Sequence, residues 1–295
     1  MKHFEIIQKI KDYTRGIDIL SGSNSPILES ITRDKVLYGE TDVECTGIVT
    51  TCYPSVKVIE KAHELNANLI ISHESLFWNH GDHTDWLEDT KNATYLKKKA
   101  LLEEYGITVW RCHDYIHSGI PDGKGGWADG IFFGFLEESG LIDYYVPSLT
   151  GPVQYSVPFI LNFKGKKLKD IYAQICERTH LNGLRYIGDP EAEIHRGAVI
   201  MHVLGPDNDK ITYVDQKNIE LVIAMELIDF TLSIYMRDSI EAGFNKAVIT
   251  AGHFNLEEPG MKYMLKWIHE AMGTSEIPVT FVPSGDVIHY YSTEN

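Results

Sequence analysis

Three apolar stretches of this chain each run directly into histidine and acidic residues, and this pattern restricts the fold more than any other feature. The stretches end at His73-Glu74, at His113-Asp114 and at Gly252-His253. Short apolar runs of this kind are typical of strands buried in a parallel sheet. Open α/β folds bind ligands beyond the carboxyl ends of their strands. Three such ends can converge on one site, so the pattern predicts a metal-dependent α/β enzyme.

The order of the predicted elements supports this fold class, because strands alternate with helices. Strands are expected at 44–52, 68–72, 107–112, 156–163, 183–187, 195–204, 219–225, 246–251 and 278–283, and helices at 2–14, 54–65, 91–105, 129–138, 167–178, 226–242 and 257–272. The stretch 118–130 is rich in glycine and proline and predicts a loop or linker. We therefore expect two α/β lobes with mixed, largely parallel sheets. The expected divisions are 1–120, 121–245 and a segment 246–295 that returns to the metal site.

The composition excludes several classes of protein. A net charge of −15 argues against a nucleic-acid partner, which requires a basic face. No run reaches the roughly 18 apolar residues of a membrane span, and the amphipathic N-terminus does not resemble a signal peptide. The four cysteines form no C-x-x-C pair, which argues against a structural zinc site. We expect a cytoplasmic protein with reduced thiols.

Each cluster allows a functional and a purely structural interpretation. His73 and Glu74 are either two metal ligands, or a histidine that caps a turn and a glutamate in water. His113 and His117 share a face if the chain is helical there, which is a workable ligand spacing. Alternatively, one of these two histidines is buried and hydrogen-bonded, and the other is exposed.

The third cluster and the remaining histidines leave similar alternatives. His253 and Glu257 form a second ligand pair, unless Glu257 only complements the dipole of the helix that follows. His80 and His83 lie in a polar loop that either contacts substrate or is solvated. The isolated histidines are interpreted as structural; they are His180, His195, His202 and His289.

With these motifs in this order, the chain resembles the Nif-three-like dinuclear metal-centre family, often called GTP cyclohydrolase type-2 homologues. The resemblance covers nearly the whole chain and is carried by residues 37–40, 46–65, 69–78, 110–117 and 250–257. It implies two α/β lobes, a ring of six identical chains, and two metal ions in a cleft between the lobes. The ligands it implies are His73, Glu74, His117, His253 and Glu257.

The chain departs from the family pattern at two of these ligands. Glu74 stands where the family usually has a second histidine, and His117 where it usually has an aspartate. Both replacements keep ligand-capable atoms, so a retained site is expected. A neutral imidazole offers only one lone pair. Bridging two ions would therefore fall to Glu257, Glu74 or Asp114, and otherwise the site holds one ion.

The resemblance and the ligand types together imply a mechanism. We expect two divalent ions per chain, drawn from zinc, manganese, iron or nickel. They would serve a hydrolase that attacks a small polar or nucleotide-like substrate with a metal-bound hydroxide. Glu74 or Asp114 would be the general base, and His80 or His83 would contact the substrate. The alternatives are a non-catalytic metal-binding or metal-delivery ring protein, and a metal-free ring that acts through partner surfaces.

Overall fold

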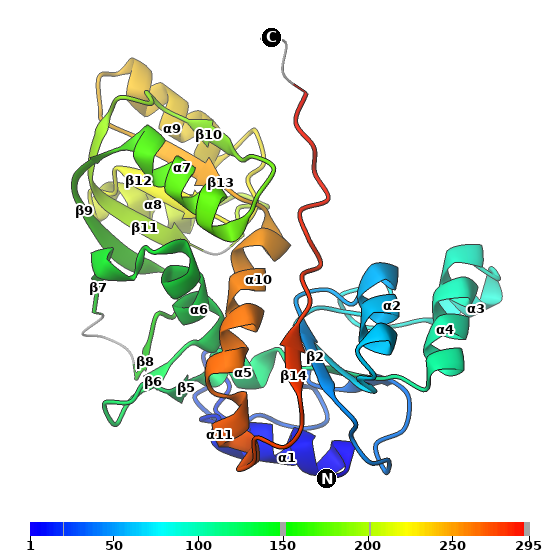
Figure 1. Ribbon diagram of the computed structural model, residues 1–295. Helices are drawn as coiled ribbons and strands as arrows, with labels where there is room; N and C mark the ends of the chain where they lie inside the picture. Colours follow the sequence, from blue (N-terminus) through cyan, green and yellow to red (C-terminus); the bar gives the residue numbers. More distant parts are fainter. Residues whose placement is uncertain (20, 148–151, 201, 292–295) are drawn as a thin grey trace. The chain divides into compact units, whose positions relative to one another are not determined.

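The computed structural model describes residues 1–19, 21–147, 152–200 and 202–291 (Figure 1). The chain forms two compact units, which are described in turn. Unit 1 comprises Met1–Gly134 and Gly260–Ser284, and unit 2 comprises Phe135–Pro259 and Gly285–Asn295. Within the described ranges, no helix has the length and apolar character needed to cross a membrane.

Unit 1 is built on a five-stranded sheet in the order β1-β4-β3-β2-β14. The strands are β1 Val36–Tyr38, β2 Ile48–Thr51, β3 Leu69–Ser72, β4 Thr108–Arg111 and β14 Val279–Phe281. Strands β4, β3, β2 and β14 are parallel, and β1 is added to β4 in the antiparallel direction. The prediction of an α/β fold with a mixed, largely parallel sheet is confirmed.

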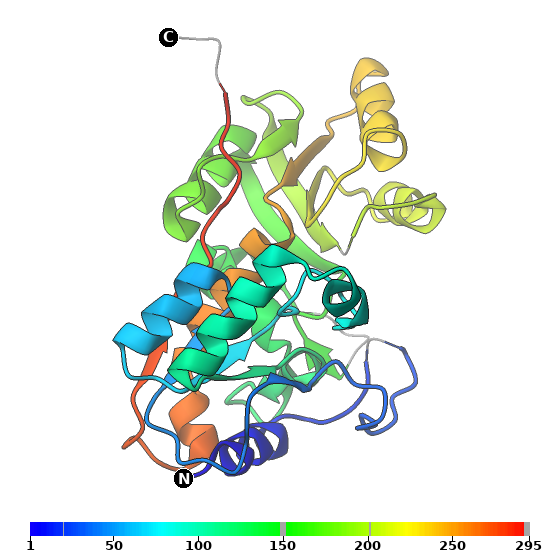
Figure 2. The same ribbon diagram turned by 90° about the vertical axis from the view of Figure 1, so that its right-hand side faces the viewer.

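Helices cover both faces of this sheet, as a parallel sheet requires. They are α1 His3–Tyr13, α2 Val56–Glu64, α3 Asp85–Asp89, α4 Ala93–Tyr105, α5 Asp114–Ser118, η2 Met264–Lys266 and α11 Ile268–Met272. Side chains alternate along β3, so that Leu69 and Ile71 pack with α1 and α11 while Ile70 packs with α2 and α4. Figure 2 shows α2 and α4 side by side. A short hairpin follows α5, formed by β5 Ile120–Pro121 and β6 Trp127–Ala128.

Unit 2 contains a six-stranded sheet in the order β10-β13-β12-β11-β9-β7. The strands are β7 Tyr145–Val146, β9 Phe159–Lys167, β10 Arg185–Ile187, β11 Glu193–Ile200, β12 Leu221–Ala224 and β13 Ala247–Thr250; a separate short strand, β8, spans Val153–Gln154. Strands β11, β12 and β13 are parallel neighbours, so their carboxyl ends lie at one edge. The helices of the unit are η1 Ile142–Tyr144, α7 Leu168–Thr179, α8 Asn208–Gln216 and α9 Leu232–Glu241.

The chain passes from unit 1 to unit 2 within α6 (Gly130–Ser139) and returns within α10 (His253–Tyr263). From the sequence, we expected these divisions after residues 120 and 245. The two helices approach closely at Gly134 and Gly260. A Cβ on Gly260 would lie 2.5 Å from the Cα of Ile131, and one on Gly134 would lie 2.6 Å from the Cα of Gly260. Glycine is therefore required at both positions by space rather than by backbone dihedral angles.

Two predicted helices begin elsewhere than expected, and both differences affect the candidate site. The helix expected from residue 226 begins at Leu232, which leaves Glu226 in the loop after β12. The helix expected from residue 257 begins at His253, so Pro259 lies inside α10 and not in its first turn. His253 and Glu257 are consequently four residues apart on one helix, where side chains share a face.

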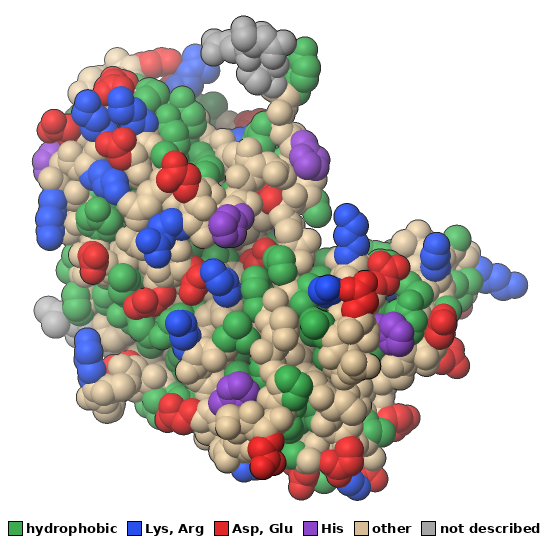
Figure 3. Space-filling view, in the orientation of Figure 1, with side chains coloured by type: hydrophobic (Ala, Val, Ile, Leu, Met, Phe, Trp, Pro, Cys, Tyr) green, Lys and Arg blue, Asp and Glu red, His purple; other side chains and the backbone are tan. Residues whose placement is uncertain are grey.

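Charged side chains are interspersed on the face of the molecule shown in Figure 3, where red and blue groups alternate without a large area of one sign. Such mixing is ordinary for a solvated protein surface.

Candidate metal-binding groups

Unit 1 brings three buried imidazoles together. His73 follows β3, His113 follows β4, and His117 lies in α5. One ring nitrogen from each histidine lies within 4.8 Å of the others. The His73 and His113 rings are stacked with centroids 4.6 Å apart, and the His117 ring meets His73 edge-on at 5.0 Å. The family resemblance implied His73 and His117 as ligands; the structure places His113, which the sequence spacing had paired with His117, beside them.

The Nδ1 atom of each of these rings faces a hydrogen-bond acceptor. The acceptors are the Cys112 carbonyl oxygen for His73 at 3.1 Å, Asp114 Oδ1 for His113 at 3.0 Å, and Asp129 Oδ2 for His117 at 2.9 Å. An acceptor at Nδ1 fixes the proton there and leaves the lone pair on Nε2, which is the arrangement common in metal-binding histidines. Burial, together with the neighbouring His73 ring, holds the pKa of His113 well below its ordinary value. This ring is therefore neutral, the form that binds a metal.

Asp114 is surrounded by hydrogen-bond donors. It accepts from the Arg33 guanidinium at 2.8 Å, the Arg33 backbone N–H at 2.9 Å and the Thr32 hydroxyl at 2.9 Å, besides His113. Burial acts to raise the pKa of Asp114, but the hydrogen bonds from His113 and Arg33 lower it well below the usual range. Burial and the charge of the neighbouring Asp114 raise the pKa of Asp34 to about 6. The geometry suits a carboxylate that orients His113.

Glu74 is held by a buried arginine that the sequence reasoning missed. Arg111 is fully buried, and its Nη2 atom lies 3.0 Å from Glu74 Oε2. The same guanidinium contacts Asp82 Oδ2 at 2.9 Å and donates to the carbonyl oxygens of His73 and His80. An arginine within an apolar strand was the available signal, since a buried guanidinium requires an anionic partner. Glu74 thus has a cationic partner in Arg111 at a position directly after His73.

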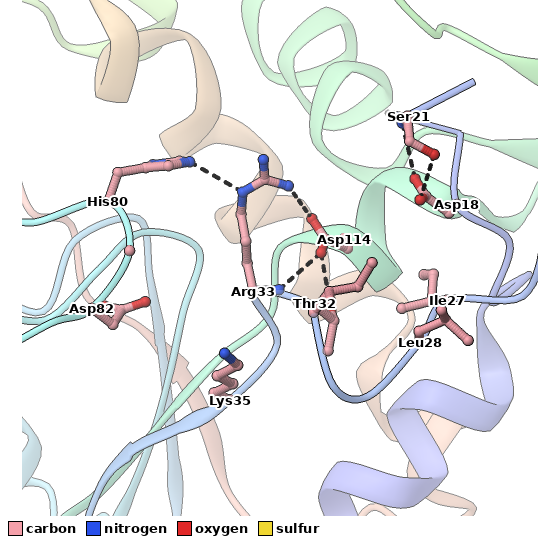
Figure 4. Close-up of a pocket in the computed structure, with 12 residues that line it drawn as sticks. Asp18, Ser21, Ile27, Leu28, Thr32, Arg33, Lys35, His80, Asp82 and Asp114 are labelled. Carbon is pink, nitrogen blue, oxygen red and sulfur yellow. Dashed lines mark hydrogen bonds and ion pairs between the residues drawn. The ribbon is translucent and has the colours of Figure 1, made fainter. Parts of the chain in front are cut away.

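A pocket of about 380 Å³ borders this histidine group (Figure 4). Its lining includes the cations Arg33 and Lys35, the acids Asp18, Asp82 and Asp114, and the apolar side chains of Ile27, Leu28 and Ile31. His80 also lines it and accepts a hydrogen bond from Arg33 Nε at 3.1 Å. Asp114 touches both the pocket and His113, so the two features are one side chain apart. His83 is exposed and is not among the lining residues.

Unit 2 contains a second group, formed by His202, Glu226 and His253. One ligand-type atom from each lies within 4.8 Å of the others. The His202 Nδ1 atom lies 2.7 Å from Glu226 Oε2, and His253 Nδ1 is hydrogen-bonded to Glu226 Oε1. The His253 Nε2 atom lies 3.2 Å from Glu257 Oε2. The predicted pair His253 and Glu257 is therefore brought together, and Glu226 contacts the other ring nitrogen of His253.

From the sequence, His202 was expected to be an isolated structural histidine and Glu226 to lie in a helix; in the structure His202 contacts Glu226, and Glu226 lies in the loop after β12. Each residue follows a parallel strand within two residues of its end, as His73 does. The apolar run ending in Glu226 was the signal, and the wrong helix start concealed it. Burial acts to raise the pKa of Glu226, but hydrogen bonds from His202 and His253 lower it to about 2.

Comparison with known proteins places the chain in a family. Residues 35–286 match Duf34/NIF3 (NGG1p interacting factor 3). A protein of Clostridium acetobutylicum, named GTP cyclohydrolase 1 type 2 homolog, is 26% identical over 259 residues, covering 87% of this chain and 88% of the relative.

Solved structures share the fold. Hypothetical protein SA1388 of Staphylococcus aureus is 17% identical with a TM-score of 0.66, and 99% of each chain is covered. Reduced HcgD from Methanocaldococcus jannaschii is 18% identical with a TM-score of 0.59, covering 95% of this chain and 97% of that one. The resemblance drawn from the motifs is confirmed, and the chain belongs to the Duf34/NIF3 family.

Proposed function

We propose that this protein binds divalent metal ions, two per chain, and hydrolyses a small polar or nucleotide-like substrate. The observation that carries the proposal is the trio of buried imidazoles in unit 1, each with Nδ1 already occupied by an acceptor. Three buried histidines without a thiolate suit zinc, manganese, iron or nickel. When bound, such an ion supplies a hydroxide nucleophile near neutral pH and polarises the substrate.

The proposed ligands are named unit by unit. In unit 1 they are His73, Glu74 and His117, with His113 as a further candidate on the strength of its position in the trio. In unit 2 they are His253 and Glu257, whose facing atoms are 3.2 Å apart. Around one tetrahedral ion, ligands about 2.1 Å from the metal stand roughly 3.4 Å from each other, so this separation suits a chelating pair.

The residues around the trio have distinct proposed roles. Lys35 and Arg33 are the two cations of the adjoining pocket, and Arg33 is already paired with Asp114. An anionic group such as a phosphate would therefore contact Lys35. His80 is the proposed substrate contact, because it lines that pocket; His83 has no such position. Of the two candidate bases, Glu74 is preferred to Asp114. Asp114 accepts four hydrogen bonds, which suits Asp114 to orienting His113 and not to taking up a proton.

A second function, metal binding without catalysis, is favoured by the same contacts. Both carboxylates beside the trio are already engaged, Glu74 by Arg111 and Asp114 by Arg33. A hydrolase needs a base that takes up a proton near working pH, and strong ion pairing opposes this. A panel of phosphoesters and nucleotides separates the two functions: turnover that depends on added metal supports the hydrolase, and metal binding without turnover supports the alternative.

The test of metal binding is zinc titration of the full chain by calorimetry, after removal of metal with a chelator. His73→Ala and His117→Ala are expected to lose at least one ion per chain. The matched control is His195→Ala, which removes a histidine whose side chain is 61% exposed and is expected to bind as the wild type. Full binding by both unit 1 variants would refute the proposed ligands. Assembly into a six-membered ring in the cytoplasm belongs to the same proposal, and light scattering tests the ring.

A further inference from the structure

The Glu226 carboxylate stands between two imidazoles and contacts both with its two oxygens. We propose that Glu226 is a positioning residue, which fixes His253 in the tautomer that presents Nε2 toward Glu257, and that His202 holds Glu226 in place. The inference rests on the proposed function in one respect, since it takes His253 and Glu257 as metal ligands. All four residues belong to unit 2.

The chemistry of the contact decides where the proton of His253 resides. A carboxylate only accepts hydrogen bonds, and a neutral imidazole carries one N–H donor and one lone pair. Nδ1 of His253 faces Glu226 and must therefore donate. In the neutral ring, which is the form that binds a metal, the lone pair is left on Nε2, the atom that lies 3.2 Å from Glu257 Oε2. A second proton on Nε2 would be donated to Glu257, so the tautomer is defined only for the ring that carries one proton. This is the carboxylate–histidine arrangement that orients metal-binding imidazoles in other proteins.

The distances distinguish positioning from direct ligation by the whole group. A separation of 2.7 Å between His202 Nδ1 and Glu226 Oε2 is that of a charge-assisted hydrogen bond. Two atoms that ligate one tetrahedral ion stand farther apart, at roughly 3.4 Å. The contact between His253 and Glu257 approaches that separation, whereas the contacts of Glu226 do not. Glu226 therefore positions the ligand pair and is not itself a ligand.

The surrounding backbone holds this arrangement firmly. The chain after His202 and the chain after Glu226 pair through a parallel bridge between Val203 and Leu227. On the other side of Glu226, the buried Thr250 hydroxyl donates to the carbonyl oxygen of Met225 at 3.0 Å.

The two rings add a further restraint. Those of His202 and His253 are stacked, with centroids 4.9 Å apart. Three parallel strand ends thus fix three side chains whose positions depend on one another.

The first readout is the tautomer of His253 in the metal-free full chain. Magic-angle-spinning NMR of protein labelled with ¹⁵N-histidine, recorded at a pH at which the His253 ring carries a single proton, identifies which ring nitrogen is protonated, and the His253→Ala spectrum assigns the signal. In the wild type and in Glu226→Asp, which retains a carboxylate, we expect His253 protonated at Nδ1. In Glu226→Ala, a substantial fraction of Nε2–H is expected. An unchanged Nδ1–H signal in Glu226→Ala would overturn the proposal.

The second readout is zinc affinity, measured by competition with a chelator. Loss of a group that orients a metal-binding histidine weakens binding by roughly 10- to 100-fold; we expect this of Glu226→Ala, with a smaller loss in His202→Ala. The control is Glu241→Gln, which alters a side chain 61% exposed on α9. Equal and complete loss of one ion in His202→Ala, Glu226→Ala and His253→Ala would overturn the proposal by making these three residues the ligands.

The two readouts separate this inference from the proposed function. If the wild type binds no zinc, the proposed function fails, while the tautomer measurement still decides the role of Glu226. If the wild type binds zinc and Glu226→Ala changes neither tautomer nor affinity, the inference fails and the proposed function stands. Circular dichroism shows whether each variant is folded, and Glu226→Asp provides the conservative substitution if Glu226→Ala is not.

Discussion

Replacing the buried Arg111 by methionine provides a demanding test of the environment assigned to Glu74. Arg111 is fully buried and Glu74 is 4% exposed, so the substitution leaves a carboxylate in the interior without its cation. Removing one partner of a buried ion pair typically costs about 3–5 kcal/mol. The guanidinium also donates to two backbone carbonyls, of His73 and His80, and each lost bond adds about 1 kcal/mol. We expect destabilisation of at least about 5 kcal/mol.

Tryptophan fluorescence during urea unfolding measures this change selectively. All five tryptophans lie in unit 1, at positions 78, 86, 110, 127 and 267, so their signal reports that unit. Lys61→Met is the matched control, because it removes a cation from an ion pair in which Lys61 and Glu64 are 52% and 62% exposed. Exposed pairs contribute little to stability, and the unfolding midpoint of this variant is expected to stay where it is.

A double variant separates charge from packing. Arg111→Met combined with Glu74→Leu replaces the pair by apolar side chains, a change that is often tolerated in protein interiors. Much of the lost stability is expected to return. The part that does not return is expected to come from Asp82, which also loses its contact with Arg111. A loss below about 1 kcal/mol in Arg111→Met, or no recovery in the double variant, would refute the reasoning.

Three further predictions concern other parts of unit 1. Burial lowers the pKa of Lys98 to about 7 from 10.5, so between these pH values the unfolded chain binds a proton that the native chain lacks. The free energy of unfolding should therefore rise with pH by up to about 1.4 kcal/mol per pH unit. Lys98→Met should flatten this slope, as measured by urea titrations at pH 7 and 9. Gly260→Ala, whose Cβ would lie 2.5 Å from the α6 backbone, should lower the melting temperature by several degrees in circular dichroism, whereas Gly205→Ala, with nothing within 4 Å, should not. Asp129→Asn should keep an oxygen to cap α6 but weaken zinc binding roughly 10- to 100-fold through His117; unaltered affinity would show that Asp129 does not orient this ring.

The parts of the fold that could be predicted are those with a local cause. Strand β3 is an uninterrupted apolar run, and α4 ends at Gly106, whose φ of 62° is the left-handed conformation typical of a helix end. The start of α9 was wrong because residues 226–231 retain helix-compatible apolar spacing, which outweighed Thr231, a residue type favoured at helix starts, directly before Leu232. Proline at position 259 suggested a first turn, but α10 begins earlier, at His253, and accommodates it.

The candidate site shows the same division between local and long-range causes. His113 and His117 lie close together because they are four residues apart along the turn that starts α5, and this depends only on sequence spacing. His202 and Glu226 were missed as partners because their proximity depends on β11 and β12 being neighbours in the sheet. Strand order follows from the packing of the whole unit, and no periodicity in the sequence encodes it. Arg111 was missed for the same reason, since its partners come from a separate loop.

The most direct test of metal binding is elemental analysis of protein purified without added metal and without a histidine tag, expressed as ions per chain. We expect close to two divalent ions, with a clear decrease in His73→Ala. A value near zero that persists after dialysis against zinc and manganese would contradict it.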